Sequence, residues 1–346
     1  MKTKIKILIT LCLSCSLLVA CKVDKTIDTI GKNASNTNSE QSLPASNTKQ
    51  EENKNIAPFT GEEVSKEIKN QAAFMAIVEN SKDARPQSGL NEADIVYETM
   101  AEGGIPRFIA VFQKNSPKII GPIRSARAYF VDISKEYNLP FAHCGYSEEA
   151  RNMIEKENLM TLNEFSYGKN YWRDNSRKAP HNLYTSADKL RELITSKSYV
   201  KPSNVKLSFN KDYWNNSSFL PAANVLLSLN KFYTTSYTFK DGKYYKTMDG
   251  TASTNREDKK PIAVTNIVIQ NTNIKLQSDM QHLTITLVGQ GDGYVISNGK
   301  AIKMKWSKKD INSQTILKDE NGKDISLNPG NTWWHIIDNS NKVEIK

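Results

Sequence analysis

Two carboxylates, Glu98 and Glu102, stand close together in a segment that is otherwise largely apolar or glycine-containing. Glu98 ends an apolar run, and Glu102 is followed by Gly103 and Gly104, which let a backbone come close to a ligand. Breaking a glycosidic bond requires a carboxylic acid that protonates the leaving oxygen, and a second carboxylate only where water or the protein is the nucleophile. We therefore predict Glu102 as the catalytic acid and Glu98 as a second catalytic carboxylate. The alternatives are a solvated turn carboxylate for Glu102 and a structural ion pair for Glu98.

Three arginines, Arg107, Arg124 and Arg127, follow the two carboxylates. Arg124 and Arg127 are spaced for one face of a helix at its predicted start. Guanidinium groups bind carboxylates in a bidentate manner, so we predict that these arginines bind the carboxylate of a lactyl or peptide group. Pairing with acidic residues of the protein itself is the alternative. Tyr129, which follows, is a candidate for stacking on a sugar ring.

A second polar segment contains His181 and Asn182 after Pro180, with Arg173 and Asp174 a few residues before it. Such a density of hydrogen-bonding groups favours a loop that orients a substrate over a catalytic base. We therefore predict His181, Asn182, Arg173 and Asp174 as substrate-binding residues.

The sequence gives no sign of a metal site or of a cofactor. Its four histidines are scattered without the spacing of metal ligands, and no glycine-rich phosphate loop occurs in the right context. Cys144, next to His143, lacks the signature of a catalytic cysteine, and we interpret it as structural. We predict neither a metal nor a cofactor.

The first half of the chain has the pattern of a mixed α/β domain, which we place at residues 59–200. Apolar runs predict strands and 3.6-residue periodicity predicts helices. The predicted strands are Phe74–Val78, Asp94–Thr99, Arg107–Phe112 and Phe141–His143. The predicted helices are Gly61–Asn70, Ser125–Glu136, Glu148–Glu157 and a helix that starts at a Thr185 cap and runs to about Ser196.

The second half, residues 201–346, predicts a mostly antiparallel β domain, so that the whole chain is of the α+β class. Two hairpins are indicated by Asp241–Gly242 and Asn298–Gly299, because type I′ turns need positive φ at both central positions. Three tryptophans are predicted as core residues. They are Trp306, Trp333 and Trp334.

The N-terminus has the features of a bacterial lipoprotein signal: three lysines, a short apolar run and a small residue before Cys21. We expect residues 1–20 to be removed, Cys21 to carry the lipid, and residues 21–58, which lack aromatic residues, to form a tether. Loss of three lysines takes the formal charge from +10 to 10 − 3 = +7. The protein is then anchored to the extracytoplasmic face of the cell membrane, where anionic wall polymers are more plausible partners than nucleic acid.

Six motifs together resemble the YerB-like bacterial lipoproteins over roughly residues 60–346. They are ARPQSGL at 84–90, ADIVYE at 93–98, EGGIPR at 102–107, GPIRSAR at 121–127, APHNLYT at 179–185 and NPGNTW at 328–333.

This resemblance implies a two-domain lipoprotein of cell-wall metabolism that cleaves or transfers peptidoglycan glycan strands. A lytic transglycosylase can work with a single Glu, which is acid first and base next, because the C6 hydroxyl of the sugar closes the ring. The alternative is a non-catalytic lipoprotein that binds wall polymer, or an adaptor that regulates a membrane-bound cell-wall enzyme.

Overall fold

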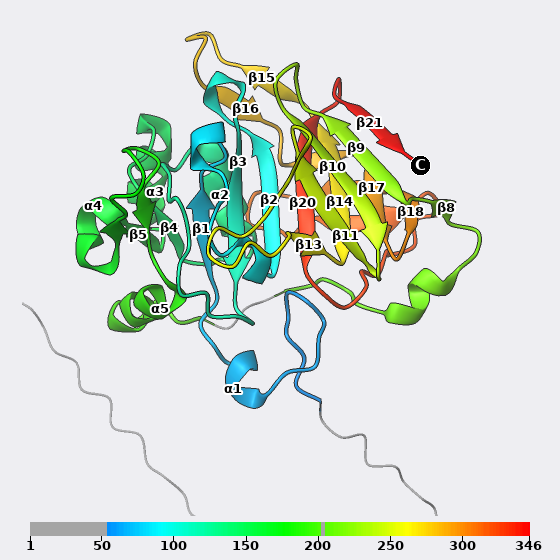
Figure 1. Ribbon diagram of the computed structural model, residues 1–346, viewed down its shortest axis with the longest axis horizontal. Coiled ribbons are helices and arrows are strands. Elements are labelled where there is room, and N and C mark those ends of the chain that lie inside the picture. Colours follow the sequence, from blue (N-terminus) through cyan, green and yellow to red (C-terminus); the bar gives the residue numbers. More distant parts are fainter. Residues whose placement is uncertain (1–53, 202–204) are drawn as a thin grey trace, which may run out of the picture. The chain divides into compact units, whose positions relative to one another are not determined.

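One large β-sheet runs through both halves of the chain in the computed structural model, which describes residues 54–201 and 205–346 (Figure 1). Its strand order is β19-β18-β17-β14-β20-β2-β3-β1-β4-β5. The halves are joined by β20 (Thr332–Asp338), which lies parallel to both β14 (Asn266–Thr272) and β2 (Ile95–Met100). The last long strand of the chain therefore completes the sheet that the first half begins.

The first half supplies five strands of this sheet together with all five α-helices of the described residues. Besides β2, its elements are α1 (Lys66–Lys69), β1 (Phe74–Val78), β3 (Pro106–Phe112), α2 (Ala128–Glu136), β4 (Phe141–His143), α3 (Glu148–Glu157), β5 (Thr161–Asn163), α4 (Glu164–Tyr167), β6 (Trp172–Arg173), β7 (Leu183–Tyr184) and α5 (Ala187–Ser196).

The second half is built mainly of antiparallel strands, so the chain is an α+β protein as predicted. Six of its strands are β8 (Leu220–Pro221), β9 (Asn224–Ser228), β10 (Thr234–Lys240), β11 (Lys243–Met248), β12 (Thr251–Ala252) and β13 (Ala263–Val264). The rest, besides β14 and β20, are β15 (Ile274–Leu276), β16 (Leu283–Ile285), β17 (Gly289–Ser297), β18 (Lys300–Lys308), β19 (Ile316–Asp319) and β21 (Lys342–Ile345).

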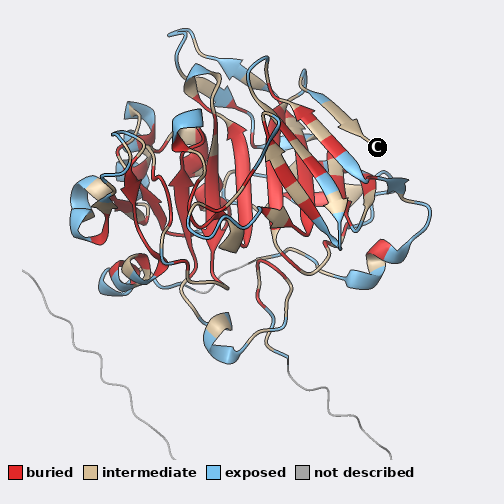
Figure 2. Cartoon of the chain, viewed as in Figure 1, coloured by how far each residue is buried: buried red, intermediate tan, exposed pale blue. Residues whose placement is uncertain are grey.

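Both faces of the large sheet are covered, which gives two cores. On one face, α5 and the smaller sheet β12-β11-β10-β9-β21 pack against Val96, Phe108 and Trp333. On the other face, α2 and α3 pack against Tyr97 and Ile109. Figure 2 shows the buried residues concentrated in the sheet strands between these layers. Because neighbouring residues of a strand point to opposite faces, each position of β2 belongs to one core or the other.

Two hairpin turns lie where the sequence predicts them. Asp241 and Gly242 have φ of 50° and 77°, and Asn298 and Gly299 have φ of 49° and 72°. Lys240 pairs with Lys243 across the first turn. The three tryptophans predicted as core residues are buried, each 1% exposed. The strands β1 and β4 and the helix α3 have the predicted bounds.

Three helix starts differ from the predictions. Helix α2 begins at Ala128 rather than Ser125, and its N-cap residue is Arg127 in an extended conformation, so Arg124 and Arg127 lie before the helix. Helix α5 is capped by Ser186, whose hydroxyl accepts from Lys189 N, and not by Thr185. Helix α1 begins at Lys66 rather than Gly61, and it is only four residues long. Cap assignment from sequence is easily off by a residue or more, because Ser and Thr also bond elsewhere.

The folded body begins before the predicted end of the tether. Ala57 is 1% exposed and accepts and donates backbone hydrogen bonds with the turn around Gly61, and Phe59 is fully buried. Residues 54–58 are therefore part of the fold, because these apolar side chains have a core to enter. Cys21, the signal peptide 1–20 and the tether up to residue 53 lie outside the described residues. Within 54–201 and 205–346, no helix has both the length and the apolar character needed to cross a membrane.

Candidate functional site

The corner between β2 and β3 holds Glu102 in a half-buried turn. Glu102, Gly103 and Gly104 form this tight turn, in which the two glycines have φ of 69° and 70°. A Cβ on Gly103 would meet nothing within 4 Å, so this side of the corner is open. The other side is held by the second half of the chain, since Asn230 Nδ2 donates to Gly104 O at 2.8 Å.

Glu102 pairs with two of the predicted arginines. Its Oε1 lies 2.7 Å from Arg127 Nε, and its Oε2 lies 3.7 Å from Arg107 Nη2. Among the described residues, neither oxygen accepts a hydrogen bond of good geometry, and the same holds for the donor Arg127 Nε. The side chain is 19% exposed, but both carboxylate oxygens are buried, so their capacity to accept hydrogen bonds is unused in this conformation.

Arg107 and Tyr129 complete this corner on the α2 side of the sheet. Arg107 donates to Ser125 O at 2.9 Å and lies over the ring of Phe130 at 5.9 Å. Burial lowers the pKa of Arg107 to about 10, with the charge of Arg127 as a further cause. Burial raises the pKa of Tyr129, and the negative charge of Glu102 adds to the rise. Both shifts show that charges of the corner are felt at short range in a poorly solvated environment.

Arg124 and His181 meet at a residue that sequence reasoning missed, Glu79. Glu79 follows β1 directly, and its Oε1 lies 3.0 Å from His181 Nδ1 and 3.5 Å from Arg124 Nε. Ser81 Oγ also donates to this oxygen at 3.0 Å. The signal that could have identified Glu79 is its position, an acidic residue immediately after a fully buried strand.

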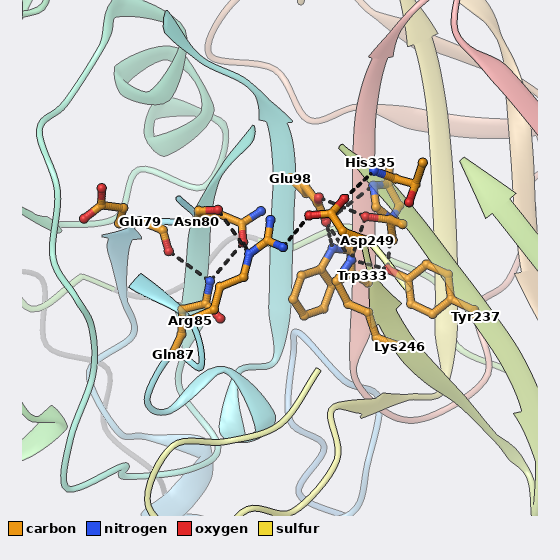
Figure 3. A network of polar contacts seen from close by, with 12 residues as sticks. Glu79, Asn80, Arg85, Gln87, Glu98, Tyr237, Lys246, Asp249, Trp333 and His335 are labelled. Carbon is orange, nitrogen blue, oxygen red and sulfur yellow. Dashed lines mark hydrogen bonds and ion pairs between the residues drawn. The ribbon is translucent and has the colours of Figure 1, made fainter. Parts of the chain in front are cut away.

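Glu98 lies in a different environment from Glu102, on the face of the sheet covered by β10 and β11. Its Oε2 accepts from Lys246 Nζ at 2.9 Å and from Trp333 Nε1 at 2.7 Å, and its Oε1 accepts from Thr235 Oγ1 at 3.3 Å (Figure 3). The residue is 1% exposed. The structural ion pair that the sequence left open for Glu98 is therefore present, and its partner is Lys246. A catalytic role of Glu98 stays a prediction.

The ionised state of this buried pair is set by its partners. Burial by itself would raise the pKa of Glu98. The charge of Lys246 and the hydrogen bonds that Glu98 accepts from Lys246 and Trp333 lower that pKa below its usual value. Burial lowers the pKa of Lys246 to about 8 and that of His335 to about 3. His335 is therefore neutral at physiological pH, and its Nε2 shares a 2.8 Å hydrogen bond with Tyr237 Oη.

The predicted residues Arg173, Asp174 and Asn182 lie together at β6 and β7. Arg173 donates to Asn182 Oδ1 at 3.0 Å, and Asp174 forms an ion pair of 2.7 Å with Arg256 from the second half of the chain. Arg256 also lies over the ring of Tyr184 at 5.3 Å. This group ties the two halves together beside the loop that carries His181.

A polar path leads from Glu79 to the Glu98 network (Figure 3). Gln87 donates to the backbone oxygen of Glu79 and to Asn80 Oδ1, and Arg85 donates to the same Asn80 oxygen and pairs with Asp249 at 2.6 Å. Asp249 in turn accepts from the backbone N–H of Thr234, which precedes the Thr235 that donates to Glu98. A cavity of about 420 Å³ borders this path and is lined by Lys82, Arg85, Gln87, Met248, Asp249 and Ser253, among others. Its volume is in the range of about 300–1,000 Å³ that is typical of small-molecule sites.

The structure thus brings Glu102, Arg107, Arg127 and Tyr129 together, and joins Arg124 to His181 through Glu79. The Sγ of Cys144 lies 3.5 Å from Glu164 Oε2, and no hydrogen bond joins Cys144 to His181 among the described residues. Burial and the charge of Glu164 raise the pKa of Cys144 to about 11, which does not suit a nucleophile. In the described parts of the chain, no group of three or more His, Cys, Asp and Glu side chains is placed to hold a metal ion.

The arrangement of the two halves agrees with what family comparison finds. Residues 59–200 match the "Protein of unknown function (DUF3048) N-terminal domain", and residues 223–334 match the "Protein of unknown function (DUF3048) C-terminal domain". The chain belongs to this two-domain family.

A relative from Bacillus subtilis (strain 168), "Putative lipoprotein YerB", is 32% identical over 297 residues, which cover 81% of this chain and 86% of the relative. The crystal structure of the YerB protein from Bacillus subtilis is similar with a TM-score of 0.76 and 31% identity, and the match covers 84% of this chain and 99% of that one. The resemblance read from the six motifs is thereby confirmed.

Proposed function

We propose that this protein is a lipoprotein, anchored through Cys21 to the extracytoplasmic face of the cell membrane, that binds peptidoglycan glycan strands and cleaves or transfers their glycosidic bonds. The anchor is supported by the signal-like N-terminus and by the name of the similar Bacillus subtilis protein. A lipid on the first residue of the mature chain would hold the folded body near the wall without a membrane-spanning helix.

The observation that carries the proposed reaction is the corner at Glu102. A carboxylate whose buried oxygens accept no well-formed hydrogen bond from the described residues lies beside Arg107 and Arg127, in a turn that is open at Gly103. Wall glycan offers the matching groups, because its muramic acid residues carry a lactyl carboxylate or a peptide. The arginines would bind that group bidentately, and Tyr129 borders the same corner.

The ion pairs of Glu102 define the rearrangement that the reaction needs. A substrate carboxylate that pairs with Arg107 or Arg127 would separate these side chains from Glu102. In this proposal Glu102 then protonates the leaving oxygen, and the C6 hydroxyl closes a 1,6-anhydro ring.

The test is to incubate the full-length protein, in detergent, with uncrosslinked glycan strands and to follow strand length and end groups by mass spectrometry. We expect shorter strands with 1,6-anhydro ends. Glu102→Gln should lower the rate by about 10²–10⁴-fold, because it keeps the shape but cannot donate the proton. The matched control is Glu149→Gln, on the exposed side of α3, which should keep the wild-type rate. Intact strands with the wild-type protein between pH 5 and 8 would refute the reaction.

The second candidate function is a non-catalytic wall-binding lipoprotein or an adaptor of a membrane-bound cell-wall enzyme. The observation in its favour is that Glu102 is held by two arginines, an arrangement suited to binding an anionic group without chemistry. It predicts that the protein sediments with glycan strands and leaves their length unchanged. Arg127→Ala should then weaken sedimentation, since it removes one of the two guanidinium groups at the corner.

A further inference from the structure

The Glu79–His181 pair fixes the proton on one nitrogen of the histidine. Glu79 is 7% exposed, and its Oε1 lies 3.0 Å from His181 Nδ1. This oxygen already accepts from Ser81 Oγ at 3.0 Å and lies 3.5 Å from Arg124 Nε, so it is the acceptor and Nδ1 carries the hydrogen in this contact. In the neutral imidazole the other nitrogen, Nε2, then has the free lone pair.

Nε2 of His181 is the atom left for chemistry. None of the described residues forms a hydrogen bond with it, and the side chain is 22% exposed. The ring is held from behind by Glu79 and Ser81, and by the turn in which His181 N donates to Lys178 O. A histidine oriented by a buried carboxylate, with its second nitrogen free, is the arrangement of a general base.

The pair lies next to the arginine corner, which is the group of Glu102, Arg107, Arg127 and Tyr129. Arg124 Nε lies 3.5 Å from the carboxylate that holds His181, and Arg107 donates to the carbonyl of the next residue, Ser125. The charge of Arg124 also contributes to the lowered pKa of Arg107. Two carboxylate–cation groups, at Glu79 and at Glu102, are thus linked through adjacent residues of one segment.

We propose that His181 is the base of this site and that Glu79 is its positioning residue. Nε2 takes the proton of the attacking hydroxyl group, either the C6 hydroxyl of the sugar or a water molecule. The hydroxyl oxygen forms the new bond to the anomeric carbon, the bond from that carbon to the bridging oxygen breaks, and the leaving oxygen takes the proton of Glu102. This assignment rests on the proposed function and divides acid and base between Glu102 and His181.

The other histidines of the chain provide internal comparison. His335 is fully buried, and both ring nitrogens of His143 lie within hydrogen-bonding distance of protein oxygens. His282 lies 2.5 Å from Asp279 in the exposed turn between β15 and β16 and is outside the arginine corner. His282 therefore matches His181 as an accessible histidine with a carboxylate partner, and serves as the control.

The first experiment compares His181→Ala and His282→Ala in the glycan assay. His181→Ala should lower kcat by about 10²–10⁴-fold, and added imidazole should restore part of the activity, because a free base can enter the space left by the ring. Glu79→Gln should lower kcat by at least about tenfold with little change in KM, because its amide can donate to Nδ1 and so favour the wrong tautomer. His282→Ala should match the wild type. Full activity of His181→Ala would overturn the proposal.

The second experiment does not depend on activity. Two-bond ¹H–¹⁵N NMR spectra of the full-length protein distinguish the tautomers of neutral histidine, and His181 should be protonated at Nδ1. Glu79→Gln should abolish that preference, whereas the tautomer of His282 should not change. If the wild-type protein leaves glycan intact, the proposed function fails and the proposal of a base fails with it. A tautomer of His181 unaffected by Glu79→Gln overturns the positioning role alone.

Discussion

Glu98 lies in a strand and Glu102 in the turn that follows it, and the two carboxylates differ in burial and in the donors around them. Glu98 lies within β2, is 1% exposed, and has a lysine, a tryptophan and a threonine as donors. Glu102 lies at the end of the strand, is 19% exposed, and has two cations nearby without a well-formed hydrogen bond among the described residues. The two residues are of the same type, but within the part of the chain that the structure describes the oxygens of Glu98 accept hydrogen bonds and those of Glu102 do not. Hydrogen bonding therefore separates a structural carboxylate from a candidate reactive one.

The two environments follow from the geometry of the sheet. Glu98 pairs with Phe108 in β3, on the face that β10 and β11 cover. Water cannot solvate its carboxylate there, so Lys246 must neutralise the charge. Arg107 pairs with Thr99 and belongs to the other face, toward α2. The strand ends at Met100, and the glycine turn that follows places the carboxylate of Glu102 beside Arg107 and Arg127.

The largest expected effect is on stability, from Glu98→Gln. Removal of the charge leaves Lys246 buried without its counter-ion, and breaking a buried ion pair in this way costs about 3–5 kcal/mol of the free energy of unfolding. Urea denaturation measures it. Glu102→Gln, at the half-buried corner, should change the same quantity by less, about 1 kcal/mol, because the Glu102 oxygens accept no well-formed hydrogen bond there from the residues described.

A combined substitution sharpens this contrast. Glu98→Leu with Lys246→Met removes both charges and leaves apolar groups that can pack, so it should be closer to wild-type stability than Glu98→Gln. If the single and the combined variants are equally destabilised, packing and not the unpaired charge accounts for the loss.

The pH dependence should also distinguish the two carboxylates. The pKa of Glu98 is lowered in the folded protein, so its contribution to stability is complete above the usual value of 4.5 and is lost as pH falls through the lower folded value. Unfolding in urea at pH 7, 5, 4 and 3 should show a constant gap between wild type and Glu98→Gln down to pH 5, and a shrinking gap below it. A gap at pH 3 equal to that at pH 7 would contradict this assignment.

A smaller effect is expected from Gly104→Ala at the corner. Gly104 has φ of 70°, and an alanine in this left-handed conformation costs roughly 1–2 kcal/mol. Thermal and urea unfolding should both report the loss. Gly168→Ala is the control, because Gly168 has a right-handed helical conformation with nothing within 4 Å of the added Cβ, and it should lose little or no stability.

The smallest effect is expected for the coupling between Glu102 and Arg127. A double-mutant cycle with Glu102→Gln and Arg127→Ala should give less than about 1 kcal/mol in the free energy of unfolding, because the pair is partly exposed and its geometry is poor. The corresponding cycle for Glu98 and Lys246 should give a clearly larger value. Equal couplings would mean that the corner is as structural as the buried network.

Much of the local structure could be predicted from the sequence. The apolar run Phe74–Val78 is β1, and the two glycine-containing turns are hairpin turns, because the signal for each lies within a few neighbouring residues. Predictions that relied on one capping residue were less accurate. Ser125 and Thr185 do not cap α2 and α5, since a hydroxyl can find other acceptors, as Thr185 does at Asn170 O.

The candidate site was predictable only in part. Glu102, Arg107 and Arg127 come together, whereas Arg124 contacts Glu79, and neither Arg124 nor Arg127 lies in the helix on which the prediction relied. Glu79 lies outside all of the sequence motifs. Its partner His181 is 102 residues away, and only the fold determines which polar residue meets which loop.

The sequence alone predicts the strands β1 and β4, the two glycine turns and the family, because these depend on neighbours along the chain. The partners of the carboxylates depend on the tertiary structure. Glu98 meets Lys246 and Trp333 from the second half of the chain only because β20 pairs with β2 and the β10–β11 hairpin covers the same face. Alternation along a strand shows which face a side chain takes, but the charge that must neutralise it on that face comes from strands far away in the sequence.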